Sequence, residues 1–136
     1  MTESPSDPAR LLRISLRANA VFSSLSGATF CVAGAAIADL LGVEPAVLVT
    51  LVGLNLLVFA GVLLFVASRR LISPPIANAI ILADLAWVAG SVVLVLADAF
   101  HPSGSIAVLF VANIVLAFAV IQFIGVRRLV GAGAAI

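Results

Sequence analysis

Four long apolar stretches divide the chain, and short polar segments holding the prolines and arginines separate them. The hydrocarbon core of a bilayer is about 30 Å thick, so a helix needs about 20 apolar residues to cross it. Barrel strands need alternating polarity, and no stretch alternates. The pattern therefore predicts an all-α integral membrane protein with four transmembrane helices, short loops and no soluble domain. The predicted spans are residues 18–41, 46–67, 76–97 and 105–126.

The prolines and one glycine support these boundaries. Pro45 and the pair Pro74-Pro75 lie at the starts of the second and third spans, where a missing N–H costs little. Gly42 follows the first span, where a left-handed residue often ends a helix.

Composition excludes several classes of protein. Of the 136 residues, 64% are hydrophobic and 10% are charged, against roughly a quarter charged in a soluble domain. A soluble globular protein, a disordered tail and a nucleic-acid-binding protein are thereby excluded. The lipid bilayer is the expected partner.

The arginines predict the orientation. All seven basic residues are Arg, and they lie before the first span, between the second and third, and after the fourth. The other two loops carry Asp39, Glu44, Asp98 and His101 instead. Basic loops stay on the cytoplasmic side. We therefore expect a multi-pass protein of the bacterial inner membrane with both termini in the cytoplasm. The arginines are Arg10, Arg13, Arg17, Arg69, Arg70, Arg127 and Arg128.

Residues 1–17 are predicted to form a cytoplasmic segment with an amphipathic helix. Arg10, Arg13 and Arg17 share one face at helical spacing, so they would lie on anionic lipid headgroups. The alternative is that they only fix the topology. Residues 130–136 are expected to form a short cytoplasmic tail.

The second and fourth spans resemble each other at an offset of 58, with six of 17 positions identical from Asn55 and from Asn113 onward. The first and third spans match more weakly at an offset of 59. We predict two helical hairpins, residues 18–71 and 72–129, as parallel repeats about an axis along the membrane normal. The alternative is convergence, since each hairpin needs basic ends and a polar residue.

The first span is rich in small residues, with 14 of the 21 from Ala18 to Ala38 being Ala, Gly, Ser, Thr or Cys. Small residues let helices approach closely in a membrane. We expect this helix to be the most enclosed, or to dock against a second copy or a larger membrane partner.

Most catalytic chemistry is missing from the sequence. Cys31 and His101 are the only residues of their kinds, so paired thiols and bis-histidine ligation within the chain are excluded. No phosphate-binding loop or nucleophile elbow is present. We expect no catalytic residues, no metal and no cofactor.

Polar residues inside the apolar stretches are the remaining candidates for a site. Asp84 lies near the middle of the third span, where a carboxyl group is costly and is a functional candidate by default. The offset of 59 places it level with Leu25, so we expect a hydrogen bond to a neighbouring Ser of the first span or to a deep Asn. For the Asn and Gln residues the alternative is packing between helices. The intramembrane candidates are Asp84, Ser23, Ser24, Ser26, Asn55, Asn113 and Trp87, and those nearer the cytoplasm are Asn19, Asn78 and Gln122.

Two functions remain. The first is a non-enzymatic membrane protein that acts through helix contacts, as a homo-oligomer or as an accessory subunit. The second is a small transporter or channel with a polar site around Asp84. A transporter predicts a cavity that reaches Asp84, whereas a packing subunit predicts a sealed and fully hydrogen-bonded carboxyl group.

Overall fold

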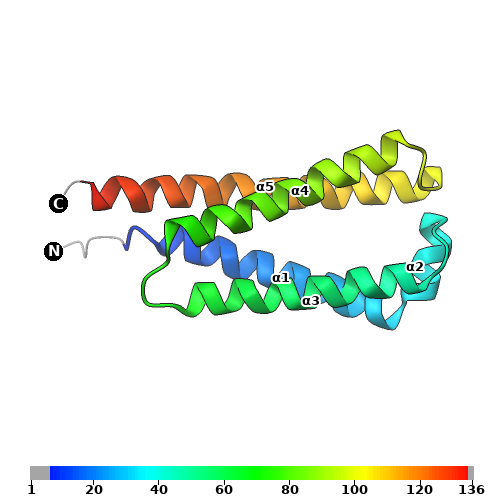
Figure 1. Cartoon of the computed structure of the whole chain (residues 1–136), viewed down its shortest axis with the longest axis horizontal. Helices are drawn as coiled ribbons and strands as arrows, with labels where there is room; N and C mark the ends of the chain where they lie inside the picture. The colour runs from blue at the N-terminus through cyan, green and yellow to red at the C-terminus, as the bar shows by residue number, and fades with distance from the viewer. Residues whose placement is uncertain (1–6, 135–136) are drawn as a thin grey trace, which may run out of the picture.

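The computed structural model describes residues 7–134, and within this range the chain is helical with no strand (Figure 1). The first six residues of the predicted segment 1–17 and the last two of the predicted tail 130–136 lie outside the described residues. The helices are α1 (Arg10–Val32), α2 (Gly34–Leu41), α3 (Val47–Ser68), α4 (Pro74–Leu96) and α5 (Pro102–Gly133).

Among the described residues, α3, α4 and α5 are each long and apolar enough to cross a membrane. α1 and α2 pass the same test only as a pair, and they are bent by 94° at Ala33. Residues 7–134 therefore contain three possible membrane spans, or four if the bent pair is one span.

The first span differs from the expected one. α1 begins at Arg10 and runs without a break through Ala18, so the arginine segment is the first part of a long helix. A straight helix from Arg10 to Leu41 would be about 48 Å long, well beyond the hydrocarbon thickness. The chain instead turns at Ala33, and Gly34 there lies so close to α3 that an added Cβ would be 2.7 Å from Thr50 Oγ1.

Most other helix boundaries follow the proline and glycine positions. Pro74 and Pro102 open α4 and α5, and Gly42 ends α2 with φ 73°. At the start of α1, the backbone N–H of Ala9 donates to Asp7 Oδ1 at 3.0 Å. α5 continues to Gly133, so part of the expected tail is helical.

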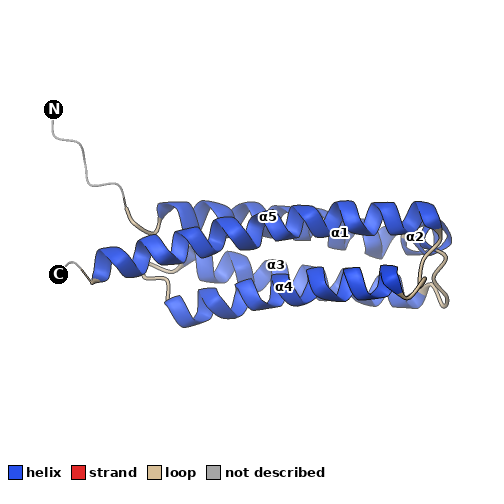
Figure 2. Ribbon diagram, turned by 90° about the horizontal axis from the view of Figure 1, so that it is seen from above, coloured by secondary structure: helices blue, strands red, loops and turns tan. Residues whose placement is uncertain are grey.

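The long helices form a bundle with one open side. α1 packs along α3, α4 packs along α5, and α1 also contacts α5 (Figures 1 and 2). α3 and α4 lie on the same side of the bundle but hardly touch. We call the space between them the α3–α4 seam.

Glycines set the closest helix approaches. An added Cβ on Gly27 would lie 2.7 Å from the carbonyl oxygen of Gly53, and one on Gly53 would lie 2.8 Å from that of Gly27. On the other side of α1, an added Cβ on Gly125 would lie 2.9 Å from Leu12 Cα. α1 is thus in close contact with α3 and α5 through glycine positions, which is how membrane helices approach without a hydrophobic driving force.

The arginines gather at one end of the bundle, where α1 and α4 begin and α3 and α5 end (Figure 1). We call this the arginine end. The guanidinium group of Arg13 donates to the carbonyl oxygens of Ala67, Arg69 and Arg70, the last at 3.4 Å. These carbonyls lie in the last turn of α3 and just beyond it, where a cation also meets the negative end of the helix dipole. Arg13 therefore joins α1 to the end of α3.

Arg69 and Arg127, which correspond at the offset of 58, make the same local contact. The guanidinium of Arg69 lies 4.2 Å from the ring centroid of Phe65, and that of Arg127 lies 5.9 Å from that of Phe123. The two halves differ at the opposite end of the bundle, however. In the first half the short helix α2 lies between α1 and α3, whereas in the second half only a short loop joins α4 to α5.

Candidate functional site

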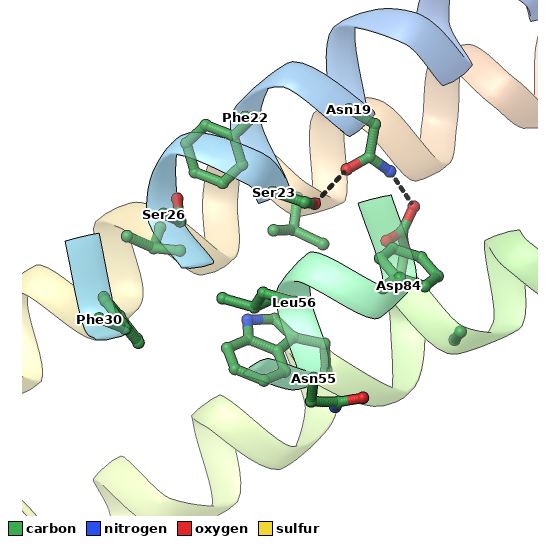
Figure 3. Close-up of a pocket in the computed structure, with 13 residues that line it drawn as sticks. Asn19, Phe22, Ser23, Ser26, Phe30, Asn55, Leu56 and Asp84 are labelled. Atoms are coloured by element: carbon green, nitrogen blue, oxygen red, sulfur yellow. Dashed lines mark hydrogen bonds between the residues drawn. The ribbon is translucent and has the colours of Figure 1, made fainter. Parts of the chain in front are cut away.

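The carboxyl group of Asp84 lies inside the bundle with 3% of the residue exposed. Asn19 Nδ2 donates to Asp84 Oδ2 at 2.8 Å (Figure 3). Gln122 Nε2 donates to the same oxygen at 3.4 Å. Ser23 Oγ donates in turn to Asn19 Oδ1 at 3.3 Å. Four polar side chains from α1, α4 and α5 thus form one buried network.

The partner of Asp84 is Asn19, so the predicted bond to a serine of the first span, or to one of the deep residues Asn55 and Asn113, was wrong. Asn19 precedes Asp84 by 65 residues in the chain, whereas the repeat offset of 59 placed Leu25 at this level. The six-residue difference is about 9 Å along a helix. It arises because α1 starts at Arg10, so that residues expected near the membrane surface lie deeper. Ser23 joins the network only through Asn19.

Gln122 is fully buried, yet its Oε1 atom has no hydrogen-bond partner within the described chain. Nearly all buried polar atoms in proteins have a partner. The network is therefore not fully satisfied by the protein's own groups.

Asp84 lines a cavity of about 240 Å³, which we call the polar cavity (Figure 3). Its polar lining comes from Asn19, Ser23, Ser26, Asn55 and Asp84. The rest of the wall is apolar or aromatic: Phe22, Phe30, Leu56, Phe59, Ala83, Trp87, Val111 and Val115. The carboxyl group is therefore buried by the bundle but faces space inside it.

The other candidate residues lie in different places. Asn55 is exposed while lining the polar cavity, so it marks the open side. Asn113 is exposed on α5 and donates to the carbonyl oxygen of Leu109 at 2.8 Å, within its own helix. Asn78 is exposed, and Ser24 is partly buried away from the cavity. Asn55 and Asn113 correspond at the repeat offset of 58, but only Asn55 lines the polar cavity.

A second, larger cavity of about 530 Å³ lies between the first and the end of the bundle that carries α2. We call it the apolar cavity, because Ser91 is the one polar side chain among the described residues that line it. Leu48 on α3 and Gly90 on α4 belong to its wall and are exposed, so it opens along the α3–α4 seam. An added Cβ on Gly90 would meet nothing within 4 Å.

The arginine end of the bundle is closed. Its core is a continuous set of buried apolar side chains from all four long helices. Leu12, Leu16 and Leu63 in this set are fully buried. Both cavities therefore lie on the far side of a packed layer from the arginines. The set includes Leu12, Leu16, Ala20, Leu63, Val66, Ile80, Ile81, Ala119 and Val126.

The sequence of α1 contains a pattern that marks Asn19 as an inward-facing residue. Leu12, Leu16, Asn19, Ser23 and Gly27 follow one another at spacings of three and four, and all are buried. Such a stripe marks the inner face of a helix, so it places Asn19 and Ser23 inside the bundle. The cavity aromatics Phe22, Phe30 and Phe59 had no such signal, because Phe is equally common on lipid-facing surfaces.

Within residues 7–134, no three His, Cys, Asp or Glu side chains are grouped so that they could hold a metal ion. Cys31 is partly buried, with Sγ 3.9 Å from the carbonyl oxygen of Thr50. Comparison of the chain with protein families, with curated proteins and with solved structures finds no match.

Proposed function

We propose that the protein is a small membrane transporter or channel that binds its ligand in the polar cavity around Asp84. The observation that carries this proposal is that the buried carboxyl group lines a cavity of about 240 Å³ instead of being sealed between helices. Ionisable groups within membrane helices occur mainly where they face a pathway or a site.

Two further observations support a binding role over a purely structural one. Gln122 Oε1 lacks a hydrogen-bond partner within the described chain, so the network around Asp84 is not fully satisfied, although Gln122 itself lines neither cavity. The polar cavity also adjoins the apolar cavity, with which it shares Phe30, Trp87 and Val111 and which opens at the α3–α4 seam. In this proposal a ligand reaches the carboxyl group past these side chains and not through the closed arginine end.

In this proposal α1 and α2 together form the first of four spans, and the arginine end faces the cytoplasm of a bacterial cell. The chain is not an enzyme, since its chemistry consists of one carboxyl group with amide and hydroxyl neighbours. The two hairpins descend from a duplicated unit, in which α2 is an addition to the first copy. The matched Phe65–Arg69 and Phe123–Arg127 contacts support that history.

The proposal is tested by access of water to the cavity. In a Cys31→Ser background, Ser26→Cys places a thiol in the cavity wall, and Ala28→Cys places one on the exposed face of the same helix. Charged methanethiosulfonate reagents react with thiols in water and not with thiols in lipid. We expect reaction at position 26 and none at position 28. No reaction at position 26 in the folded protein would overturn the proposal.

The α3–α4 seam favours a second function, in which the protein acts through helix contacts. Apolar side chains on both helices remain exposed there, including Leu48 at 45% and Leu94 at 47%. A second copy of the chain or a larger membrane protein would cover them. Native mass spectrometry in mild detergent would test this second function. A protein that acts through helix contacts is expected as a stable homo-oligomer or with a co-purifying partner, whereas a transporter or channel formed by one chain is expected as a monomer.

A further inference from the structure

The two cavities lie end to end. Phe30, Trp87 and Val111 line both of them, so these side chains form the junction between the polar and the apolar space. The combined space therefore has a polar end at Asp84 and an apolar end under α2. A ligand that fills it must itself be amphipathic.

The ionisable chemistry of the two cavities is acidic. Asp84 is the only ionisable side chain in the wall of either cavity, among the residues that the structure describes. None of the seven arginines lines either cavity, and His101 is exposed in the loop before α5. An anionic ligand would be an unpaired negative charge in hydrocarbon whether Asp84 is ionised or neutral, which is strongly unfavourable. A cation would pair with the carboxylate and stabilise its ionised form.

The aromatic wall suits the same class of ligand. Phe22, Phe30, Phe59 and Trp87 surround the polar cavity, and they come from α1, α3 and α4. Aromatic faces attract organic cations, most strongly where water is excluded. Phe22 is also held against Phe118 of α5, with ring centroids 5.9 Å apart, so part of this wall is fixed in place.

We propose that the site binds a lipophilic organic cation, whose charged group lies at Asp84 and whose apolar part fills the apolar cavity. The ligand reaches the site from the membrane through the α3–α4 seam, on the side away from the arginine end. This inference rests on the proposed function and specifies its substrate class.

Trp87 provides the measurement, because it is the only tryptophan in the chain and lies at the junction of the cavities. The purified protein in neutral detergent micelles is titrated with tetraphenylphosphonium, and with triphenylphosphine oxide as a neutral probe of similar aryl shape. We expect a saturable change of Trp87 fluorescence with the cation and weaker binding of the neutral probe. Equilibrium dialysis against protein-free micelles gives the affinities.

Two pairs of variants test the charge and the route. Asp84→Asn removes the charge but keeps a hydrogen-bonding group, and Asp98→Asn removes the same charge outside both cavities. Affinity for the cation should fall about tenfold or more in the first and stay unchanged in the second. Gly90→Phe fills open space in the wall of the apolar cavity, whereas Gly61→Phe fills open space on α3 outside both cavities. Only Gly90→Phe should weaken binding.

The outcomes separate this inference from the proposed function. Equal affinity for both probes, unchanged by Asp84→Asn, would overturn the cation inference and leave a ligand-binding cavity. Absence of saturable cation binding would also overturn it, even where Ser26→Cys reacts in water. Unreactive Ser26→Cys overturns the proposed function itself. Equal elution volumes and helical circular dichroism of each variant pair establish that the variants are folded.

Discussion

Asn19 and Asp84 are hydrogen-bonded across the bundle at 2.8 Å, although 65 residues separate them in the chain. The bond joins α1 to α4, two helices that share no long interface, because α4 packs mainly along α5. It therefore links the two helix pairs at the level of the polar cavity. A bond in this position affects both stability and the shape of the site.

Asp84 variants should separate hydrogen bonding from charge. Asp84→Asn retains an acceptor for Asn19, so we expect it to fold with near-normal stability. Asp84→Leu leaves the amides of Asn19 and Gln122 without their partner, and we expect a loss of about 1–2 kcal/mol, the scale of a hydrogen bond between membrane helices plus misfit. Unfolding by sodium dodecyl sulfate in mixed micelles measures both.

Asn19→Leu and Asn113→Leu form a matched control for that prediction. Asn19 is buried in the network, whereas Asn113 is exposed and bonds only to its own helix. The first change should destabilise the protein, and the second should be neutral or slightly stabilising because it adds an apolar group facing lipid. Equal effects of the two changes would contradict the network.

The contact between Gly27 and Gly53 predicts a strong effect of a single methyl group. Gly27→Ala places a Cβ 2.7 Å from a backbone oxygen of α3, which cannot move without shifting the helix. Such overpacking costs about 1–3 kcal/mol. The control is Gly61→Ala, where nothing lies within 4 Å and the better helix propensity of Ala should stabilise the helix slightly. Thermal unfolding in the same detergent compares the two, and a tolerated Gly27→Ala would argue against this close approach.

Several features of the fold could be predicted from the sequence because single residues determine them. Pro74 opens α4, Gly42 ends α2 in a left-handed conformation, and the arginines gather at one end. The apolar run lengths likewise gave the helical class and the approximate positions of α3, α4 and α5. These signals are local, so they do not depend on how helices pack.

The bend at Ala33 could not be predicted, because no proline or charge marks it. The run from Ala18 to Leu41 has no charged residue before Asp39 and no proline, and the turn depends on how close Gly34 comes to Thr50 of α3. The break and the early start of α1 at Arg10 both depart from the repeat. The offset of 59 therefore gave Leu25 level with Asp84, where the structure has Asn19.

The candidate site was only partly accessible from the sequence, for the same reason. Asp84 is conspicuous as a carboxyl group in an apolar run, and Gln122 and Asn19 are conspicuous as amides. Which of them meet depends on helix rotation and depth, and these follow from contacts such as that of Gly125 with Leu12. The cavities exist because α3 and α4 hardly touch. No pattern of residues in the sequence directly indicates that two helices fail to pack together.

Arg13 should matter more for stability than its neighbours in the same segment. Its guanidinium group donates to carbonyl oxygens at the end of α3, including that of Arg69 at 2.7 Å. Arg13→Gln loses the charge and most of these bonds, so we expect destabilisation of about 1 kcal/mol. Arg10→Gln removes the same charge from an exposed side chain and should have little effect. If both variants unfold alike, Arg13 acts only through its charge.

The arginine end is predicted to face the cytoplasm, because all seven arginines lie there and basic segments are retained on that side. In a Cys31→Ser background, His101→Cys places an exposed thiol at the opposite end and Arg128→Cys places one at the arginine end. We expect a membrane-impermeant maleimide to label position 101 in intact cells and position 128 only after the membrane is permeabilised. Labelling at 128 with protection at 101 would reverse the orientation. The cavities, which lie away from the arginine end, would then lie toward the cytoplasmic side of the membrane, and the ligand would enter the α3–α4 seam from the cytoplasmic leaflet.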